Sequence, residues 1–185
     1  MVNRRSPAET GPEIRSVSRL SGIELPDLAQ QKLDEIGRPA INLHRALGHT
    51  PEMLGPLLDL IHAARYDALT PRQEREMMIV RIGQLEKSEY ELAHHVPMAL
   101  EAGLSQDQLV EMGQWRSSEL FSQRAKAVLA LADSLGAGLP LVDESVDEHL
   151  SAAEQTELAM VGSTYIMIAR ISRTFEIEID DYLRT

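Results

Sequence analysis

The chain has 185 residues, of which 43% are apolar and 4% aromatic, a composition typical of a globular protein with room for one sizeable core. Its formal charge of −11 argues against nucleic acid and against anionic membrane surfaces as partners. It contains no cysteine, which excludes disulfides, thiolate metal sites and thiol-dependent peroxidase chemistry in this chain.

Residues 1–18 are expected to form a flexible N-terminal arm, because prolines, a glycine and alternating charges replace apolar periodicity there. The arm has the charge of a secretion signal but not the apolar segment that should follow it. No later run approaches the roughly 18 apolar residues of a membrane span. We therefore expect a cytoplasmic protein with no membrane partner, in which residues 19–185 form a single helical domain.

Apolar residues at helical spacing begin after Pro26 and predict helices across residues 28–36, 41–47 and 53–61. Thr50 and Pro51 are typical of the N-cap and first residue of the last of these helices. Residues 70–73, Thr-Pro-Arg-Gln, resemble a capping box for a helix from about 71 to 87. Residues 88–91, Ser-Glu-Tyr-Glu, resemble another, for a helix that runs to Ala102 and stops at Gly103.

Three further helices are predicted in the second half of the chain. A short one begins at residues 105–108, a second covers residues 122–135, and a long apolar one begins at the cap formed by residues 151–154 and reaches about Phe175. Gly136, Gly138 and Pro140 end the second of these. No segment alternates apolar and polar residues over a strand length, so the sequence predicts an all-α fold.

Glu91 and His95 lie four residues apart in the second capped helix, so their side chains share a face. Glu76 lies in the preceding helix, and the connection between the two helices is very short, which favours antiparallel packing. Glu76 is then about three turns and His95 about two turns from the connection, so the two side chains can meet. A partly desolvated imidazole beside a carboxylate suits general acid or base chemistry, because its pKa lies near neutrality.

Each of these residues also has a structural interpretation. His95 borders the apolar stripe of its helix and can be a core histidine satisfied by a backbone carbonyl. Glu76 can be a solvated side chain paired with Arg72. Glu91 is the third residue after Ser88, so its carboxylate can complete a capping box by accepting the backbone N–H of Ser88.

The remaining polar side chains of this region allow further contacts. The phenol of Tyr90 can donate a hydrogen bond to a carbonyl oxygen or simply pack. His94 projects away from the apolar stripe, which places it on the surface or against another subunit. We expect no metal site, because adjacent histidines point about 100° apart on a helix and the His-Glu-x-x-His spacing is absent. Surface or capping roles suffice for the other histidines, which form no ligand set: His44, His49, His62 and His149.

Residues 70–105 resemble the carboxymuconolactone decarboxylase family, which includes alkylhydroperoxidase D. In the peroxidase branch of that family, a Glu precedes a Cys-x-x-Cys pair by twelve residues and a His follows the pair by four. That Glu falls here on Glu76, the two cysteines fall on Ser88 and Glu91, and the His falls on His95. Tyr90 takes the place of a second His. Weaker similarity in residues 42–51, 127–133 and 157–170 extends the resemblance to about residues 35–175.

The resemblance implies an alkylhydroperoxidase D-like helical bundle that assembles as a homo-trimer or homo-hexamer, with pockets near subunit contacts. Five methionines would suit such contacts or an adaptable pocket, and core packing explains them equally well: Met77, Met78, Met98, Met160 and Met167.

The resemblance also implies a cofactor-free lyase or decarboxylase that acts on a small carbonyl, lactone or carboxylate compound, because decarboxylases of the family need no Cys-x-x-Cys. In this hypothesis His95 shuttles a proton, Glu76 orients or recharges it, and Glu91 or Tyr90 polarises the substrate oxygen. Further substrate-binding candidates beside them are Ser88 and His94. The alternative is a non-catalytic oligomeric binding or scaffold protein of the same fold, in which Ser88 and Glu91 are only caps and His95 is sealed in the core.

Overall fold

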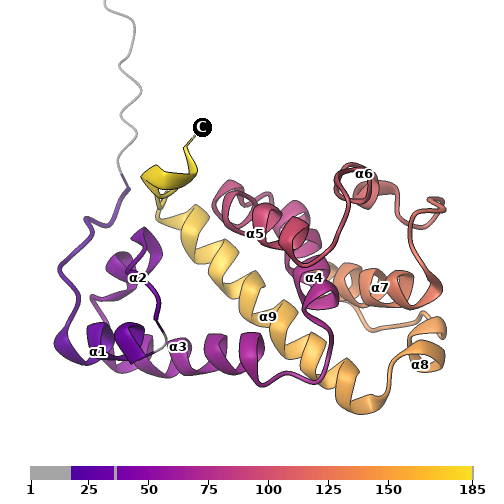
Figure 1. Cartoon of the computed structure of the whole chain (residues 1–185), viewed down its shortest axis with the longest axis horizontal. Helices are drawn as coiled ribbons and strands as arrows, with labels where there is room; N and C mark the ends of the chain where they lie inside the picture. The colour runs from indigo at the N-terminus through magenta and orange to yellow at the C-terminus, as the bar shows by residue number, and fades with distance from the viewer. Residues whose placement is uncertain (1–17, 36, 185) are drawn as a thin grey trace, which may run out of the picture.

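The computed structural model describes residues 18–35 and 37–184, and every regular element within them is a helix (Figure 1). The elements are α1 (Asp27–Glu35), α2 (Asn42–Leu47), α3 (Pro51–Tyr66), α4 (Arg72–Leu85), α5 (Glu89–Glu101), α6 (Gln106–Glu111), η1 (Met112–Gln114), α7 (Gln123–Ala137), α8 (Ser145–His149), α9 (Ala152–Thr174) and η2 (Asp181–Leu183). The expected all-α class is confirmed. The arm expected over residues 1–18 lies outside the described residues, apart from Ser18.

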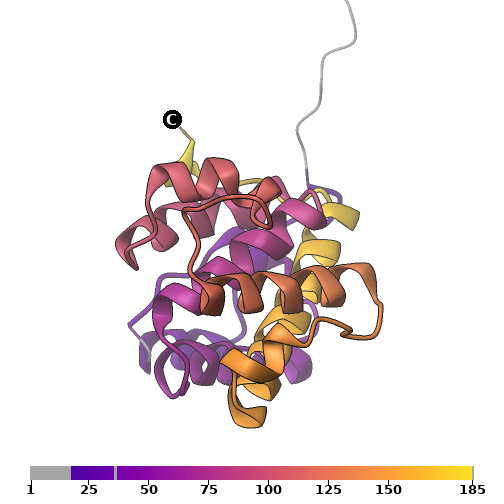
Figure 2. The same ribbon diagram turned by 90° about the vertical axis from the view of Figure 1, so that its right-hand side faces the viewer.

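Helix α4 lies at the centre of the main core and packs against α5, α7 and α9 (Figures 1 and 2). All its residues from Arg75 to Val80 are buried, as are Ile82 and Gly83, so the helix is enclosed on every side. This explains why its apolar residues follow no single face in the sequence. The partner α5 packs close to the backbone of α4 at Gly83, where an added Cβ would lie 3.1 Å from Leu92 Cδ2.

A smaller apolar cluster joins α1 and α3 at the N-terminal end of the described chain. Its buried members are Leu25, Ala29, Leu33, Leu54 and Leu58. Helix α9 crosses from this end to the α7–α8 end, so that α3 lies along one part of α9 and α4 with α5 along another (Figure 1). None of the described helices is both long and apolar enough to cross a bilayer.

Serine caps begin four of the helices as the sequence predicted. Ser88, Ser105, Ser122 and Ser151 each accept a backbone N–H from the third residue of the helix that follows. The capping box expected at residues 70–73 is wrong: Pro71 is the N-cap of α4, and no side chain caps that helix. The backbone N–H and the hydroxyl of Thr70 both donate to Glu157 of α9, so Thr70 fastens two helices together.

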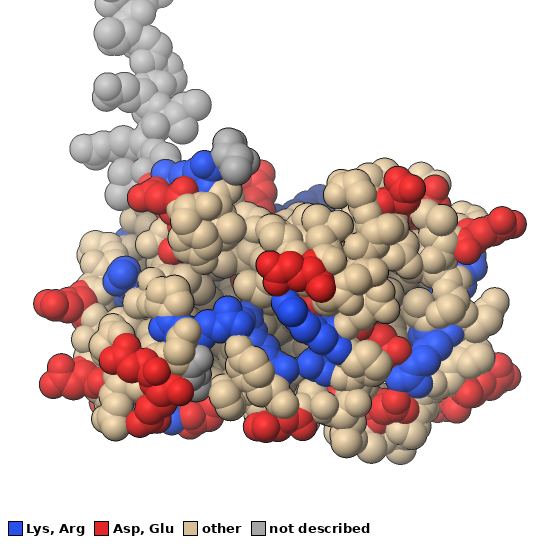
Figure 3. Space-filling model, in the orientation of Figure 1, with Lys and Arg blue, Asp and Glu red and all other residues tan. Residues whose placement is uncertain are grey.

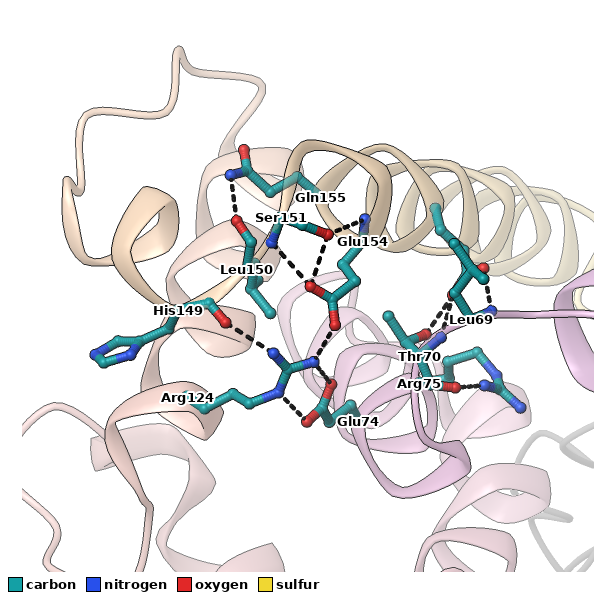
Figure 4. A network of polar contacts seen from close by, with 11 residues as sticks. Leu69, Thr70, Glu74, Arg75, Arg124, His149, Leu150, Ser151, Glu154 and Gln155 are labelled. Carbon is teal, nitrogen blue, oxygen red and sulfur yellow. Dashed lines mark hydrogen bonds and ion pairs between the residues drawn. The ribbon is translucent and has the colours of Figure 1, made fainter.

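A second polar junction surrounds Arg124 at the start of α7 (Figure 4). Its guanidinium donates to both carboxylate oxygens of Glu74 in α4 and to Glu154 in the first turn of α9. It also donates to the backbone carbonyl of His149 at 2.7 Å. One arginine therefore holds the ends of α4, α7, α8 and α9 in register.

Candidate active site

The turn between α4 and α5 brings the two helices into an antiparallel hairpin. Lys87 takes a left-handed conformation with φ of 53°, and the next N–H, that of Ser88, donates to the carbonyl of Gly83 at 2.9 Å. This tight turn fixes the register of the two helices relative to one another. Glu76 and His95 are thereby brought opposite one another, as the helix lengths predicted.

Glu76 and His95 form a buried hydrogen-bonded pair. The Nδ1–H of His95 donates to Glu76 Oε2 at 2.8 Å, and His95 is 3% and Glu76 5% exposed. Because the carboxylate takes the Nδ1 proton, the Nε2 atom of a neutral His95 carries the lone pair. Arg72 Nε lies 4.0 Å from the other oxygen of Glu76, so this carboxylate is buried between two partners rather than solvated.

Glu91 faces the free side of the same imidazole. Its Oε2 lies 3.8 Å from His95 Nε2, and its side chain is 3% exposed. Ser88 Oγ accepts the N–H of Glu91, but the N–H of Ser88 is already bonded to Gly83. The capping box expected at residues 88–91 is therefore only half formed, and the Glu91 carboxyl is left to the interior.

Burial sets the protonation of both groups. It raises the pKa of Glu91 from 4.5 to about 8, against a smaller opposing effect of Arg65. Burial also lowers the pKa of His95, although the hydrogen bond and charge of Glu76 act in the other direction. Near neutral pH the site therefore contains a protonated carboxyl group beside an unprotonated Nε2.

An internal cavity of about 110 Å³ opens beside these groups. His95 and Glu91 line it together with aliphatic, aromatic and basic side chains from α1, α2, α3, α9 and the C-terminal segment. The ring of Tyr165 in α9 meets the His95 ring edge to face, with 4.8 Å between centroids, and holds the imidazole in place. The cavity explains how a small molecule could reach Nε2 in an otherwise closed core.

Several residues of this cavity were not expected from the sequence. His44 has the capping role expected of it, since its Nδ1 accepts the N–H of Ile41 at the start of α2, but it also lines the cavity. His62, Arg65 and Tyr165 line it as well. Burial lowers the pKa of His44 to about 4, so its imidazole is neutral. No local signal marks these residues, because they come from α2, α3 and α9, far from the α4–α5 hairpin in sequence.

His94 is buried and faces the interior, which corrects its expected place on the surface or against another subunit. Its Nδ1 lies 2.9 Å from the carbonyl of Tyr90, and its Nε2 lies 3.1 Å from Asp180 Oδ2. The phenol of Tyr90 donates to the same Asp180 oxygen and accepts the N–H of Leu43. Tyr90 and His94 thus line the cavity with their polar atoms already engaged.

Ser88, the third substrate-binding candidate, is fully buried and is not among the residues that line the cavity. Its hydroxyl contacts Ser172 Oγ at 3.2 Å and caps α5. Among the described residues, no group of three or more His, Asp or Glu side chains is arranged to hold a metal ion. The candidate site therefore consists of His95 and Glu91 at the cavity wall, with Glu76 bound to the far side of the His95 ring.

Residues 51–134 match the carboxymuconolactone decarboxylase family, which confirms the resemblance found in the sequence. No curated protein matches the chain. Among solved structures, the fold is similar to the alkylhydroperoxidase AhpD core of an uncharacterized peroxidase-related protein from Ralstonia eutropha. The TM-score is 0.73 and the identity 20%, and the match covers 90% of this chain and 94% of that one.

Two further solved structures are similar. A protein of unknown function from Agrobacterium tumefaciens, described as a candidate antioxidant defence protein AhpD, has a TM-score of 0.65 and 19% identity over 72% of this chain and 94% of that one. The debrominase Bmp8 has a TM-score of 0.69 and 14% identity over 85% of this chain and 86% of that one. At these identities the likeness establishes the alkylhydroperoxidase D-like fold.

Proposed function

From the match of residues 51–134 to the carboxymuconolactone decarboxylase family and the acid–base pair in the cavity, we propose that this protein is a lyase or decarboxylase-like enzyme that works by proton transfer. Its substrate is a small carbonyl, lactone or carboxylate compound. The supporting observation is that His95 Nε2, with its tautomer set by Glu76, faces a protonated Glu91 across 3.8 Å at the cavity wall.

In the proposed reaction, His95 Nε2 removes a proton from the carbon next to a carbonyl group, and the electron pair moves onto the carbonyl oxygen. Glu91 donates a hydrogen bond to that oxygen, or transfers a proton that returns to Glu91 when the carbonyl re-forms, and the protonated His95 returns a proton to carbon. Glu91 takes this role rather than Tyr90, because the phenol of Tyr90 is engaged by Asp180 and Leu43.

A carboxylated substrate follows a related course. Its carbon–carboxylate bond breaks, carbon dioxide leaves, and the electron pair again moves onto the carbonyl oxygen beside Glu91. Glu91 passes its proton across 3.8 Å to His95 Nε2, which delivers it to the carbon that lost the carboxylate, and the Glu91 carboxylate then takes a new proton from water. These steps require only the side chains named, the substrate and one proton from water. With no cysteine in the chain, peroxide reduction by a thiol pair has no nucleophile here.

The proposal is tested with unsaturated γ-lactones, their carboxylic acids and β-keto acids in deuterated water. Proton NMR measures exchange of C–H for C–D, and released carbon dioxide is measured in parallel. His95→Gln should lower the rate on any active compound by about 100-fold or more, the usual contribution of a general base. Glu76→Gln should lower it less, because the imidazole is retained but no longer held in one tautomer.

The matched control is His149→Gln, which replaces a histidine whose ring lies outside the cavity. It should react like the native protein. If the native protein catalyses neither exchange nor decarboxylation across the set, or if His95→Gln is as fast as the control, the enzymatic proposal is wrong. A loss of folding stability without any loss of rate would instead support the non-catalytic binding or scaffold role.

A further inference from the structure

Arg65, in the last turn of α3, lines the cavity and is not paired with any described carboxylate. Its Nε atom is buried and has no hydrogen-bond partner among the described residues. The sulfur of Met98 lies 3.8 Å from one terminal nitrogen, and the phenol of Tyr165 lies beside the guanidinium. Although burial acts to lower it, the pKa of Arg65 is raised by Tyr165 and by the charge of Glu76. Glu76 and Arg65 form no ion pair, since Glu76 pairs with Arg72 and His95. The half-buried guanidinium therefore keeps a donor for an anion from outside the chain.

A second hollow of about 330 Å³ lies on the other side of Arg65. It shares five lining residues with the inner cavity, so the two spaces have a common wall: Arg38, Arg65, Tyr66, Met98 and Tyr165. Arg72 and Arg75 also line this outer hollow. Four arginines therefore surround it, against two acidic side chains, Glu76 and Glu101.

The arginines of the outer hollow are only partly neutralised. Arg72 pairs with Glu101 at 3.2 Å, but Arg38 donates to the phenol of Tyr66 and Arg75 donates to backbone carbonyls. Figure 3 shows lysine and arginine atoms gathered near the middle of one face, in a molecule with acidic atoms over much of its rim. Because the chain carries a net charge of −11, such a local excess of positive charge is needed to admit an anion.

We propose that Arg65 is the anion-binding residue of the candidate active site, and that its ligand is a small carboxylate with a compact apolar body. The inference rests on the proposed function and names the part of the substrate that does not react. The carboxylate lies at the wall between the two hollows, where the Arg65 guanidinium receives it. His62, whose Nδ1 is also buried without a partner and which lines the same cavity, supplies a second polar contact.

The shape and chemistry of the inner cavity define the rest of the ligand. Leu33, Ile41, Leu58 and Ile168 line it, so the body that follows the carboxylate is apolar. A volume of about 110 Å³ suits one ring rather than a long chain. With the anionic group at Arg65, that ring extends toward His95 and Glu91, which places a ring carbon beside the acid–base pair.

Benzoate and its neutral isostere benzamide test this inference by isothermal titration calorimetry, without any reaction. The native protein should bind benzoate more tightly than benzamide, and Arg65→Gln should weaken benzoate binding by about 10- to 100-fold while leaving benzamide unchanged. The control Arg19→Gln removes one exposed charge away from both hollows and should bind benzoate like the native protein.

Thermal unfolding gives a second readout that a purely structural arginine would not satisfy. Without ligand, Arg65→Gln should unfold close to the temperature of the native protein, because the half-buried guanidinium forms no ion pair with a described carboxylate. Benzoate should then raise the unfolding temperature of the native protein and of Arg19→Gln, but not that of Arg65→Gln.

The inference is overturned if Arg65→Gln binds benzoate as well as the native protein, or if benzoate and benzamide bind the native protein equally. His95→Gln separates this test from that of the proposed function, because it should lose the reaction and still bind benzoate. Binding that depends on Arg65 without any proton exchange would leave the anion site standing and contradict only the catalytic proposal.

Discussion

Burial raises the pKa of Glu91 and lowers the pKa of His95. The directions differ because a carboxyl group is charged when it loses a proton, whereas an imidazole is charged when it gains one. The interior therefore keeps both uncharged near neutral pH, although they lie only 3.8 Å apart. An uncharged acid beside an uncharged base can exchange protons with a ligand without first being desolvated. Glu76, by contrast, keeps its two oxygens toward His95 and Arg72.

The raised pKa of Glu91 predicts a pH-dependent penalty on folding. Because the native state holds this proton up to a pKa of about 8 and the unfolded chain only to about 4.5, native stability should fall as pH rises between these values. Glu91→Gln removes the ionisation. The variant should match the native protein near pH 5 and exceed its unfolding free energy near pH 9 by on the order of 3 kcal/mol.

Urea unfolding at these two pH values measures the effect, with Glu89→Gln as the control. Glu89 lies on the exposed side of the same helical turn, so its replacement should leave the pH dependence as it is. Parallel curves for the native protein and Glu91→Gln would mean that Glu91 is already ionised in the native state.

The segment after α9 closes the candidate site through one carboxylate. Asp180 accepts the backbone N–H of Asn42 at 2.9 Å, the phenol of Tyr90 at 3.0 Å and the Nε2–H of His94 at 3.1 Å. The C-terminal segment is thus bound to the start of α2 and to α5 at once. Since α2 and α5 both contribute to the cavity wall, Asp180 determines how that wall is closed.

Replacing Asp180 by Ala should destabilise the protein by about 3 kcal/mol, because three buried donors lose their common acceptor. Denaturant unfolding measures the loss. The neighbouring residue offers a matched control: Asp181 is exposed and, within residues 18–35 and 37–184, its side chain pairs with Arg184 alone, so Asp181→Ala should change the unfolding free energy by less than about 0.5 kcal/mol. Equal stability of the two variants would show that the C-terminal segment contributes nothing to closing the fold.

At the scale of the whole molecule, α9 carries an apolar surface that the described chain does not cover. Met160 and Met167 are seven residues apart on one face and are 55% and 41% exposed, whereas Met77 and Met78 are buried in the core. We propose that a second subunit covers this surface of α9 in a homo-trimer or homo-hexamer, as the family resemblance implies.

Light scattering after gel filtration tests the assembly, and the native protein should have a mass of three or six times 20.6 kDa. Met160→Lys combined with Met167→Lys should shift it toward a single chain, because two charges cannot be buried at an apolar contact without partners. Met53→Lys, at a methionine 73% exposed on α3, is the control and should leave the mass unchanged. A native protein that elutes as one chain would contradict the proposed assembly.

The sequence by itself determined most of the elements and one side of the candidate site. Apolar spacing and serine caps depend on neighbours within four residues, so the bounds of α4, α5, α7 and α9 could be predicted closely. The short connection between α4 and α5 likewise implied that Glu76 and His95 meet, because two antiparallel helices of known length allow few registers.

Only the tertiary structure decided what surrounds that pair. Glu91 could complete a capping box only if the N–H of Ser88 were free. That N–H donates to the backbone carbonyl of Gly83, so the Glu91 carboxyl does not cap the helix. Arg65, His44 and Tyr182 reach the cavity from helices and a C-terminal segment that lie tens of residues away in the chain. Their positions follow from how whole helices pack, and the electrostatics of the site follow from burial, which no short stretch of sequence encodes.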